Sequence, residues 1–308
     1  MRRAFKVLVW FVVLTMVVPS ALGAAIGYAK GWPASWRQAS WASSGTLPDA
    51  ATTNTAKVMV LSSRTGRWKG IFAEHMSIVM KLAGDTSWTR YDVVGWGMPV
   101  RENAYPADAF WYGNSPRVIH ELEGEAAERL IPAIRASIRK YPYSASGSYL
   151  IWPGPNSNTF VSWVVRHTDG FAAELSPVAV GKDYLGPGLQ FARAPSETGY
   201  TVSLNGYVGA TLAYAEGFEL HIAGGTIGID PDDLAIKLPA FGKLSVWDLV
   251  ELSPFHHDRT GSGHLLRTRH KKMPASNAGM MRSESRLNMK NTIPRYRSFP
   301  HQSLCKSF

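Results

Sequence analysis

Short runs of bulky apolar residues, some of them alternating with polar residues, recur along residues 57–245, and two longer stretches between these runs have helical spacing. Alternation is typical of strands, because successive side chains of a strand point to opposite faces. Strands are predicted at residues 57–62, 70–81, 87–97, 109–114, 149–152, 199–204, 211–214 and 218–222, and residues 236–245 are expected to close the fold. The predicted fold class is therefore α+β, a mainly antiparallel sheet with a few helices.

The first helix is predicted between residues 115 and 140. Ser115 and Pro116 suit its N-cap and its first helical position. An apolar stripe follows at helical spacing, formed by Ala126, Leu130, Ile134 and Ile138. Pro132 lies inside this pattern and predicts a kink or a break into two short helices.

The second helix is predicted after the Pro-Gly-Pro turn that ends at residue 155. Asn156, Ser157, Asn158 and Thr159 directly precede an apolar run that starts at Phe160. Oxygens of such side chains accept hydrogen bonds from first-turn N–H groups that have no partner within the helix. The same position favours an oxyanion or a nucleophile of lowered pKa, although an ordinary N-cap is the more frequent role.

The N-terminus carries an uncharged, mostly apolar segment of 23 residues, 7–29, preceded by three positive charges. As a membrane anchor, this length crosses a bilayer once. As a signal peptide, the segment offers small residues for cleavage at Ala21-Leu22-Gly23. Both interpretations leave the positive end in the cytoplasm and the body beyond the membrane.

Three tryptophans after this segment favour the anchor. Trp32, Trp36 and Trp41 have spacings that place them near one face of a helix, and indole rings suit the headgroup level of a membrane. Ordinary packing is the alternative role for them. No second span is predicted, since charged residues interrupt the apolar run 208–230, which reads better as soluble strands with glycine turns.

Charge and cysteine are concentrated in the C-terminal tail. The formal net charge is +10, and residues 255–308 hold eleven Lys/Arg and two Asp/Glu, so this tail carries nine of the ten charges. The nearly neutral body therefore gives no electrostatic argument for a nucleic-acid partner. The single cysteine, Cys305, also lies in the tail, which leaves the body without a disulfide or a cysteine nucleophile.

The tail is expected to be disordered, and its abrupt change in composition would also fit a frameshifted or foreign terminus. Its His and Asp residues have spacings that match no standard metal-ligand pattern, so no metal site is predicted: His256, His257, Asp258, His264 and His270. The predicted organisation is an anchor or signal at 1–29, a juxtamembrane linker at 30–56, an α+β domain at 57–254 and the basic tail at 255–308.

Several segments resemble a bacterial group, the domain-of-unknown-function family 3750. They are Gly-Ile-Phe-Ala-Glu-His from residue 70, Thr-Arg-Tyr-Asp-Val-Val-Gly-Trp-Gly from 89, Tyr-Pro-Tyr from 141, Ile-Trp-Pro-Gly-Pro-Asn-Ser-Asn-Thr-Phe from 151, Val-Gly-Lys-Asp-Tyr from 180 and Ile-Lys-Leu-Pro-Ala-Phe-Gly-Lys-Leu from 236. The resemblance covers residues from about 33 to 245. It implies membership of that family and brings no assigned activity.

A more distant resemblance is to the circularly permuted papain-like hydrolases, which include the lecithin–retinol acyltransferase-like and peptidoglycan-peptidase-related groups. It rests on His75 in an early strand, followed by Asn-Ser-Asn-Thr-Phe at a helix start. It implies a permuted papain-like core, with Ser157 at the position of the nucleophilic cysteine and His75 at that of the base. Asp92 in the next strand is placed to orient His75. Serine is much harder to deprotonate than cysteine, which favours binding over catalysis.

The function expected from these features is that of a membrane-associated cell-envelope protein whose papain-like groove binds a peptide- or acyl-type ligand. A serine-dependent hydrolase of an amide or ester bond and a purely structural envelope domain are the alternatives. The candidate binding residues are Asn156, Asn158, Thr159, Trp152 and Tyr112. No cofactor is expected, and the body is expected in the bacterial periplasm, either held at the inner membrane or released by signal cleavage.

Overall fold

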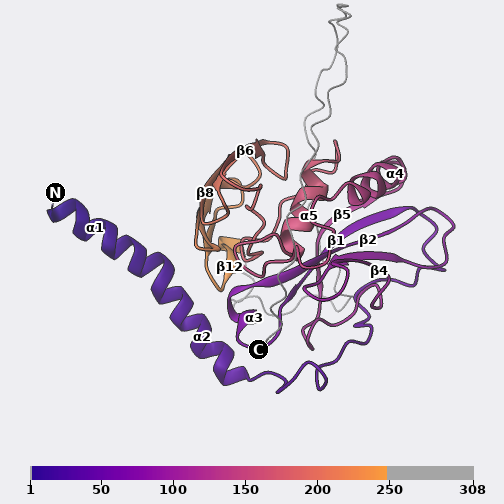
Figure 1. The fold of residues 1–308 in the computed structure, drawn as a ribbon, viewed down its shortest axis with the longest axis horizontal. Helices are drawn as coiled ribbons and strands as arrows, with labels where there is room; N and C mark the ends of the chain where they lie inside the picture. The colour runs from indigo at the N-terminus through magenta and orange to yellow at the C-terminus, as the bar shows by residue number, and fades with distance from the viewer. Residues whose placement is uncertain (1, 248–308) are drawn as a thin grey trace, which may run out of the picture. The chain divides into compact units, whose positions relative to one another are not determined.

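The computed structural model describes residues 2–247, which form an N-terminal helix, a five-stranded sheet and a seven-stranded sheet (Figure 1). Both sheets are antiparallel throughout and only a few further helices accompany them, so the predicted α+β class is confirmed. The tail at 255–308 and its histidines lie outside the described residues.

The N-terminal helix is continuous from Arg2 to Lys30. It consists of α1 (Arg2–Val12), a π-helical turn η1 (Val13–Val17) and α2 (Val18–Lys30). By length and composition it is able to cross a membrane, which fits an anchor and a signal sequence alike.

The three tryptophans do not share a helix face, contrary to the prediction. The helix ends at Lys30, before the first of them, because Gly31 adopts a positive φ of 69°. Trp41 packs instead against aromatic rings of the body, with its ring centroid 5.4 Å from that of Tyr105 and 5.1 Å from that of Trp111.

The five-stranded sheet has the order β4-β3-β2-β1-β5. Its strands are β1 (Lys57–Arg64), β2 (Glu74–Lys81), β3 (Thr89–Val93), β4 (Val100–Glu102) and β5 (Arg117–Glu123). The two central strands are covered on both faces, which explains why nearly all of their residues are buried. The main core lies on one face, where Met76, Ile78 and Tyr91 pack with apolar residues of two helices.

These helices are α4 (Glu125–Arg139) and α5 (Ser157–Arg166), both on one side of the five-stranded sheet in Figure 1. The α4 stripe that packs inward includes Ala127, Ile131, Ile134 and Ile138. Pro132 is exposed inside one unbroken helix, so the predicted division into two helices did not occur.

Four predictions were wrong in whole or in part: the helix predicted at 115–140 is confirmed only from Glu125, and the strand predicted at 70–81 only from Glu74. The predicted helix start at Ser115 and Pro116 precedes strand β5, because residues 117–123 pair with the free edge of β1. Residues 69–72 form the short helix α3 (Lys69–Phe72) instead of the first part of a strand, since β1 ends at Arg64, opposite Glu74, and leaves them no partner.

Residues 109–114 form isolated bridges and a tight turn instead of a strand, because Tyr112 and Gly113 have positive φ angles of 52° and 83°. Residues 149–152 are irregular as well, and end in a bend. Their irregular path leads into α5, whose start is tied to the neighbouring chain by Asn156.

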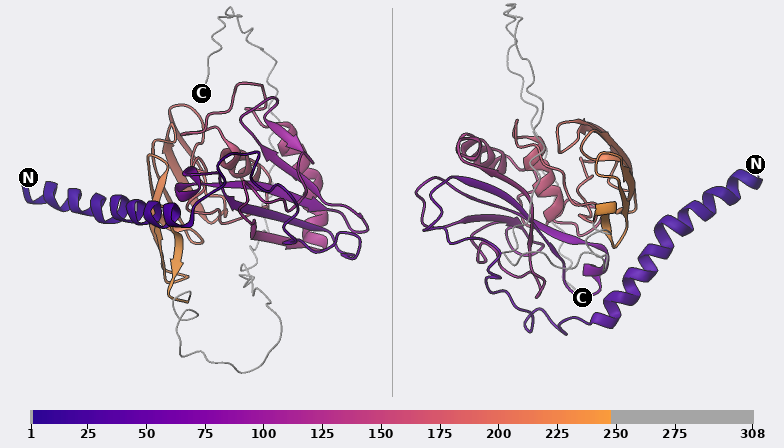
Figure 2. Two further views of the ribbon diagram at one scale, coloured as in Figure 1. Left: turned by 90° about the horizontal axis from the view of Figure 1, so that it is seen from below. Right: turned by 180° about the vertical axis from the view of Figure 1, so that it is seen from behind.

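The seven-stranded sheet is a simple meander in which each strand pairs with the next along the chain. Its strands are β6 (Leu189–Arg193), β7 (Gly199–Leu204), β8 (Val208–Ala213), β9 (Gly217–Ile222), β10 (Gly225–Asp230), β11 (Ala235–Leu238) and β12 (Gly242–Ser245). The strands predicted near 199–204, 211–214 and 218–222 are therefore confirmed. Figure 2 shows this curved sheet as a layer distinct from the five-stranded sheet.

Helix α5 lies between the two sheets (Figure 1). On one side, Phe160 packs in the main core with Met76 of β2. On the other side, Arg166 donates hydrogen bonds from Nε to the carbonyl of Arg193 at 2.8 Å and from Nη2 to Thr201 Oγ1 at 3.4 Å. Helix α5 is consequently held between both sheets.

Candidate functional site

The start of α5 is capped by Asn156, as the polar run predicted. Its Oδ1 accepts hydrogen bonds from the amides of Asn158 at 2.9 Å and Thr159 at 3.1 Å. Its Nδ2 donates to the carbonyls of Ile151 at 3.2 Å and Val180 at 3.0 Å. All of these bonds hold the start of α5. Asn156 therefore acts as a clamp that ties the first turn of the helix to the chain at Ile151 and at Val180.

Asn158 completes the edge of strand β2. Strand β3 pairs with β2 only at residues 78–80, which leaves the first residues of β2 without a partner strand on that side. There the Asn158 carboxamide accepts a hydrogen bond from the Met76 amide at 3.1 Å and donates one to the Glu74 carbonyl at 2.8 Å. The side-chain amide of Asn158 thus makes the two hydrogen bonds that a peptide group of a neighbouring strand would make, one on each side of His75.

Ser157 is 4% exposed and lies beside the hydroxyl of Tyr149. Burial raises the pKa of Tyr149 to about 12, an effect that the hydrogen bond with Ser157 partly offsets. The serine therefore has a neutral phenol as its neighbour.

His75 and Asp92 lie together on the sheet face opposite the main core. The His75 ring stacks on Trp111 at a centroid distance of 3.6 Å, and its Nε2 lies 3.9 Å from Asp92 Oδ2. Arg90 Nε donates to the same carboxylate oxygen at 2.7 Å. Burial lowers the pKa of His75, and Asp92 only partly compensates. Burial raises the pKa of Asp92, but His75 and Arg90 outweigh it and hold that pKa below its usual value.

The structure does not join Ser157 to His75 by a hydrogen bond among the described residues, and His75 Nε2 is buried without a hydrogen-bond partner. Alternation along β2 explains where His75 lies. Met76 points into the core with α5, so its neighbour His75 points to the other face of the sheet.

The other three candidate binding residues differ in what they contact. Thr159 Oγ1 donates to the carbonyl of Gly181 at 2.8 Å and is buried. Trp152 Nε1 donates to the carbonyl of Ala223 at 3.0 Å, while much of its ring stays exposed. Tyr112 lies with Trp41 and lines a cavity of about 500 Å³ at the end of the N-terminal helix.

A second cavity, of about 520 Å³, opens between the five-stranded sheet and strand β12, and the sequence did not predict it. Its walls combine charged and polar groups with apolar ones: Ser62, Arg64, Glu74, Ser115, Arg117, Val118, Ile119, Glu174, Leu175, Ser176, Pro177, Phe241, Gly242 and Lys243. Ser157 and His75 line neither this cavity nor the one near Tyr112.

The charged wall of this cavity is organised around the buried carboxylate of Glu74. Arg117 Nη2 donates to both of its oxygens at 2.8 Å, and Ser62 Oγ donates to Oε2 at 2.7 Å. Burial raises the pKa of Glu74, but Arg117 outweighs it and the pKa is lowered. The charged residues Glu74 and Arg117 were visible in the sequence, but the predicted helix at 115–140 hid their pairing across the sheet.

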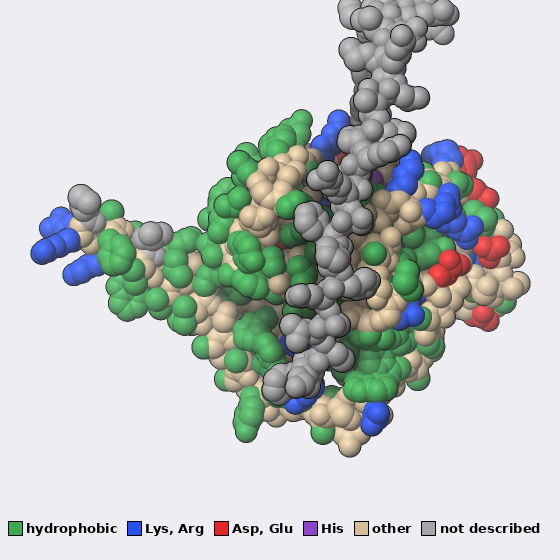
Figure 3. Space-filling model, viewed as in Figure 1, with side chains coloured by type: hydrophobic (Ala, Val, Ile, Leu, Met, Phe, Trp, Pro, Cys, Tyr) green, Lys and Arg blue, Asp and Glu red, His purple; other side chains and the backbone are tan. Residues whose placement is uncertain are grey.

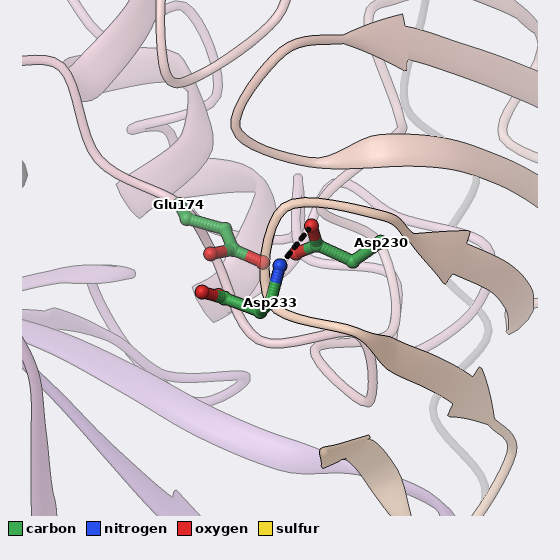
Figure 4. A group of neighbouring side chains, drawn as sticks. All are labelled: Glu174, Asp230 and Asp233. Carbon is green, nitrogen blue, oxygen red and sulfur yellow. Dashed lines mark hydrogen bonds between the residues drawn. The ribbon is translucent and has the colours of Figure 1, made fainter. Parts of the chain in front are cut away.

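An acidic cluster of Glu174, Asp230 and Asp233 lies at the edge of the same region (Figure 4). Its carboxylate oxygens lie within 4.8 Å of one another, the arrangement of a cation site. The ammonium of Lys243 contacts all three: it is 2.7 Å from Asp230 Oδ2, 3.1 Å from Glu174 Oε2 and also bonded to Asp233. The Lys243 ammonium thus occupies the position between these carboxylates that a cation would take.

A model of the family described as "Protein of unknown function (DUF3750)" matches residues 55–184 of the chain. The match contains β1 to β5 and helices α4 and α5. It also contains Asn156 and Asn158, which hold the start of α5. No curated protein and no solved structure gave a match. The segment that builds the five-stranded sheet and the start of α5 is therefore similar to the family of proteins of unknown function DUF3750.

Proposed function

We propose that this chain is a membrane-attached binding protein of the cell envelope, which holds the carboxylate of a peptide- or acyl-type ligand in the cavity between its two sheets. The observation that carries the proposal is Arg117 in that cavity. Its side chain is 54% exposed, and its position is fixed by the buried Glu74.

The chemistry of Arg117 supports a carboxylate ligand. Among the described hydrogen bonds, only Nη2 of its guanidinium is used, toward Glu74 and Ser176. Arginine offers five N–H donors, so the two N–H groups of Nη1 are left to donate to a second carboxylate. A guanidinium held by a buried partner loses little rotamer entropy on binding.

The rest of the cavity fits a ligand that is partly apolar. Val118, Leu175 and Phe241 contribute apolar surface beside the arginine. A cavity of about 520 Å³ is within the range that accommodates small ligands or the end of a longer one. An acyl chain or an apolar peptide side chain would lie against this wall.

Membrane attachment is proposed through the helix from Arg2 to Lys30, which has the length and the apolarity of a single span. Arg2, Arg3 and Lys6 precede its apolar part, which favours a cytoplasmic N-terminus and a body in the periplasm. Cleavage of this helix would release the same body into the same compartment.

The binding proposal is tested with the full chain in lipid nanodiscs. Three probes are titrated by calorimetry: a tripeptide with a free terminal carboxylate, its amide, and octanoate. We expect the free acids to bind and the amide to bind at least about tenfold more weakly, because a charged hydrogen bond contributes about 1.5–3 kcal/mol. Arg117→Gln should remove this preference, while Arg129→Gln on the exposed face of α4 should retain it. Equal binding of acid and amide would refute a carboxylate site.

A serine-dependent hydrolase is the second candidate. It is favoured by the Asn158 carboxamide, which holds the Ser157 helix start against the β2 backbone beside His75. In this function Ser157 would be the nucleophile, His75 the base and Asp92 its orienting partner, with Asn156 or Asn158 assisting the oxyanion. A fluorophosphonate probe decides between the candidates: labelling of wild type and not of Ser157→Ala supports a hydrolase, and labelling of neither excludes it.

A further inference from the structure

The seven-stranded sheet carries an apolar row on its solvent-facing side. Register places six exposed residues in line across consecutive strands from β7 to β12: Tyr200, Leu212, Phe218, Ile229, Ile236 and Leu244. Leu212 is 70% exposed and Ile229 is 55% exposed. In Figure 3, hydrophobic side chains gather over this part of the molecule and along the N-terminal helix.

The opposite face of this sheet is polar and buried. In the neighbouring row, register aligns Thr201, Thr211 and Glu219, and Lys237 continues this row beyond Gly228. Lys237 Nζ is 2.9 Å from Glu219 Oε1, which closes the polar layer. A sheet with one face in water normally has the reverse pattern, apolar inside and polar outside. The inverted pattern therefore indicates that the outer face is covered by something apolar.

The apolar N-terminal helix adjoins this face. Met16 Sδ lies 3.3 Å from the place that a Cβ on Gly225, at the start of β10, would occupy. Further along, Gly23 faces Ala240 so closely that a Cβ on Gly23 would be 2.5 Å from it. The helix thus lies against the sheet-bearing body from Met16 onward, a length of about 22 Å at 1.5 Å per residue. That length is roughly one membrane leaflet with its headgroups.

Charged and indole side chains stand at the end of this contact. The cavity of about 500 Å³ at the C-terminal end of the helix is lined by Lys30, Trp32 and Arg67, among others. Basic groups attract lipid phosphates, and indole rings favour the headgroup level. These side chains therefore place the level of the lipid headgroups at the C-terminal end of the helix, near Lys30.

We propose that the apolar face of β7 to β12 rests in the acyl-chain region of the leaflet that surrounds the helix from Met16 to Lys30. The inference rests on the proposed membrane attachment and adds a second contact of the body with the same bilayer. The occupant of the face is lipid, because the only covering group that the described residues place next to it is the apolar helix.

The test uses the full chain with Cys305→Ser, reconstituted into vesicles of phosphatidylethanolamine and phosphatidylglycerol with brominated acyl chains. Single cysteines carry a nitrobenzoxadiazole label, at Leu212→Cys and Ile229→Cys on the face, at Leu14→Cys in the helix, and at Glu128→Cys on exposed α4. We expect bromine to quench the first three labels at least twofold and to leave the label at position 128 unchanged. Thermal unfolding of each variant checks that it is folded. If one of the two face variants does not fold, the label at the other face position still decides the test.

Quenching at position 14 without quenching at 212 and 229 would overturn the inference and leave the membrane attachment intact. Quenching at none of the positions would overturn both. Face labels that are shielded from aqueous iodide but not quenched by bromine would show that a second copy or another protein covers the sheet, which also refutes a lipid contact.

Discussion

Asn158 Oδ1 accepts a hydrogen bond from the backbone amide of Met76 at 3.1 Å, although the two residues lie 82 positions apart. The bond is possible because β3 diverges from β2 before this point and leaves an edge free. One side chain therefore satisfies two buried backbone groups of the sheet and fixes where helix α5 begins. Both candidate functions depend on this position, since it places α5 beside the strand that carries Glu74 and His75.

Asn158→Ala is expected to lower the free energy of unfolding by about 2–4 kcal/mol, because it leaves two buried backbone groups without partners. Denaturant unfolding of the full chain in detergent, followed by tryptophan fluorescence, measures the change. Asn54→Ala is the matched control, since Asn54 is exposed in a loop and should change stability by less than about 0.5 kcal/mol. Equal effects of the two substitutions would contradict the bridging role of Asn158.

Gly181→Ala is expected to destabilise the start of α5. Gly181 has a φ of 90°, and a Cβ there would lie 2.4 Å from Asn156 Nδ2. Gly84→Ala is the control, because Gly84 also has a positive φ, 78°, but open space around it. Both variants lose about 1 kcal/mol to backbone strain, and overpacking should cost Gly181→Ala about 1–3 kcal/mol more in thermal or denaturant unfolding. Equal losses of stability in the two variants would mean that Asn156 shifts away from a Cβ at position 181 at no cost in free energy.

Stability should fall in acid through Glu219. Burial raises the pKa of this carboxyl, but the charges of Lys182 and Lys237 outweigh it and lower the pKa to about 2 from 4.5. A carboxyl whose pKa is lower in the folded state stabilises the fold above its unfolded pKa. That contribution is lost as the pH falls from about 4.5 to about 2, which denaturant unfolding at a series of pH values will show.

Glu219→Gln separates this residue from other acid-sensitive groups. It should be about 3–5 kcal/mol less stable than wild type at pH 7, because it leaves buried lysine charges unpaired. The difference should shrink toward pH 2, where the wild-type carboxyl is itself protonated. Glu128→Gln on exposed α4 should match wild type at every pH, and a pH-independent gap for Glu219→Gln would contradict the assignment.

Lys243→Ala should turn the acidic cluster into a weak cation site. The variant leaves three carboxylates within 4.8 Å of one another without their ammonium, so it should unfold at a lower temperature than wild type. Millimolar Ca²⁺ should restore part of the difference, since Ca²⁺ prefers carboxylate oxygens. Wild type should show no such shift, and NaCl at equal ionic strength controls for screening. The same Ca²⁺ shift in both proteins would show that Lys243 does not occupy the cation position.

Local sequence determined those elements whose signals lie within a few residues. Asn156 ahead of an apolar run defined the start of α5, and alternation defined β7, β8 and β9. The length and apolarity of the N-terminal segment predicted the helix that ends at Lys30. These features depend on capping and side-chain periodicity, which the chain expresses without distant partners.

Tertiary structure decided the rest, because pairing and burial join residues that are far apart. Residues 117–123 became a strand since β1 offered them an edge, and residues 69–72 became a helix since no strand was left to pair with them. The same is true of the site. No spacing along the chain shows that Arg117 holds Glu74 in a cavity, that Lys243 contacts three carboxylates, or that His75 stacks on Trp111.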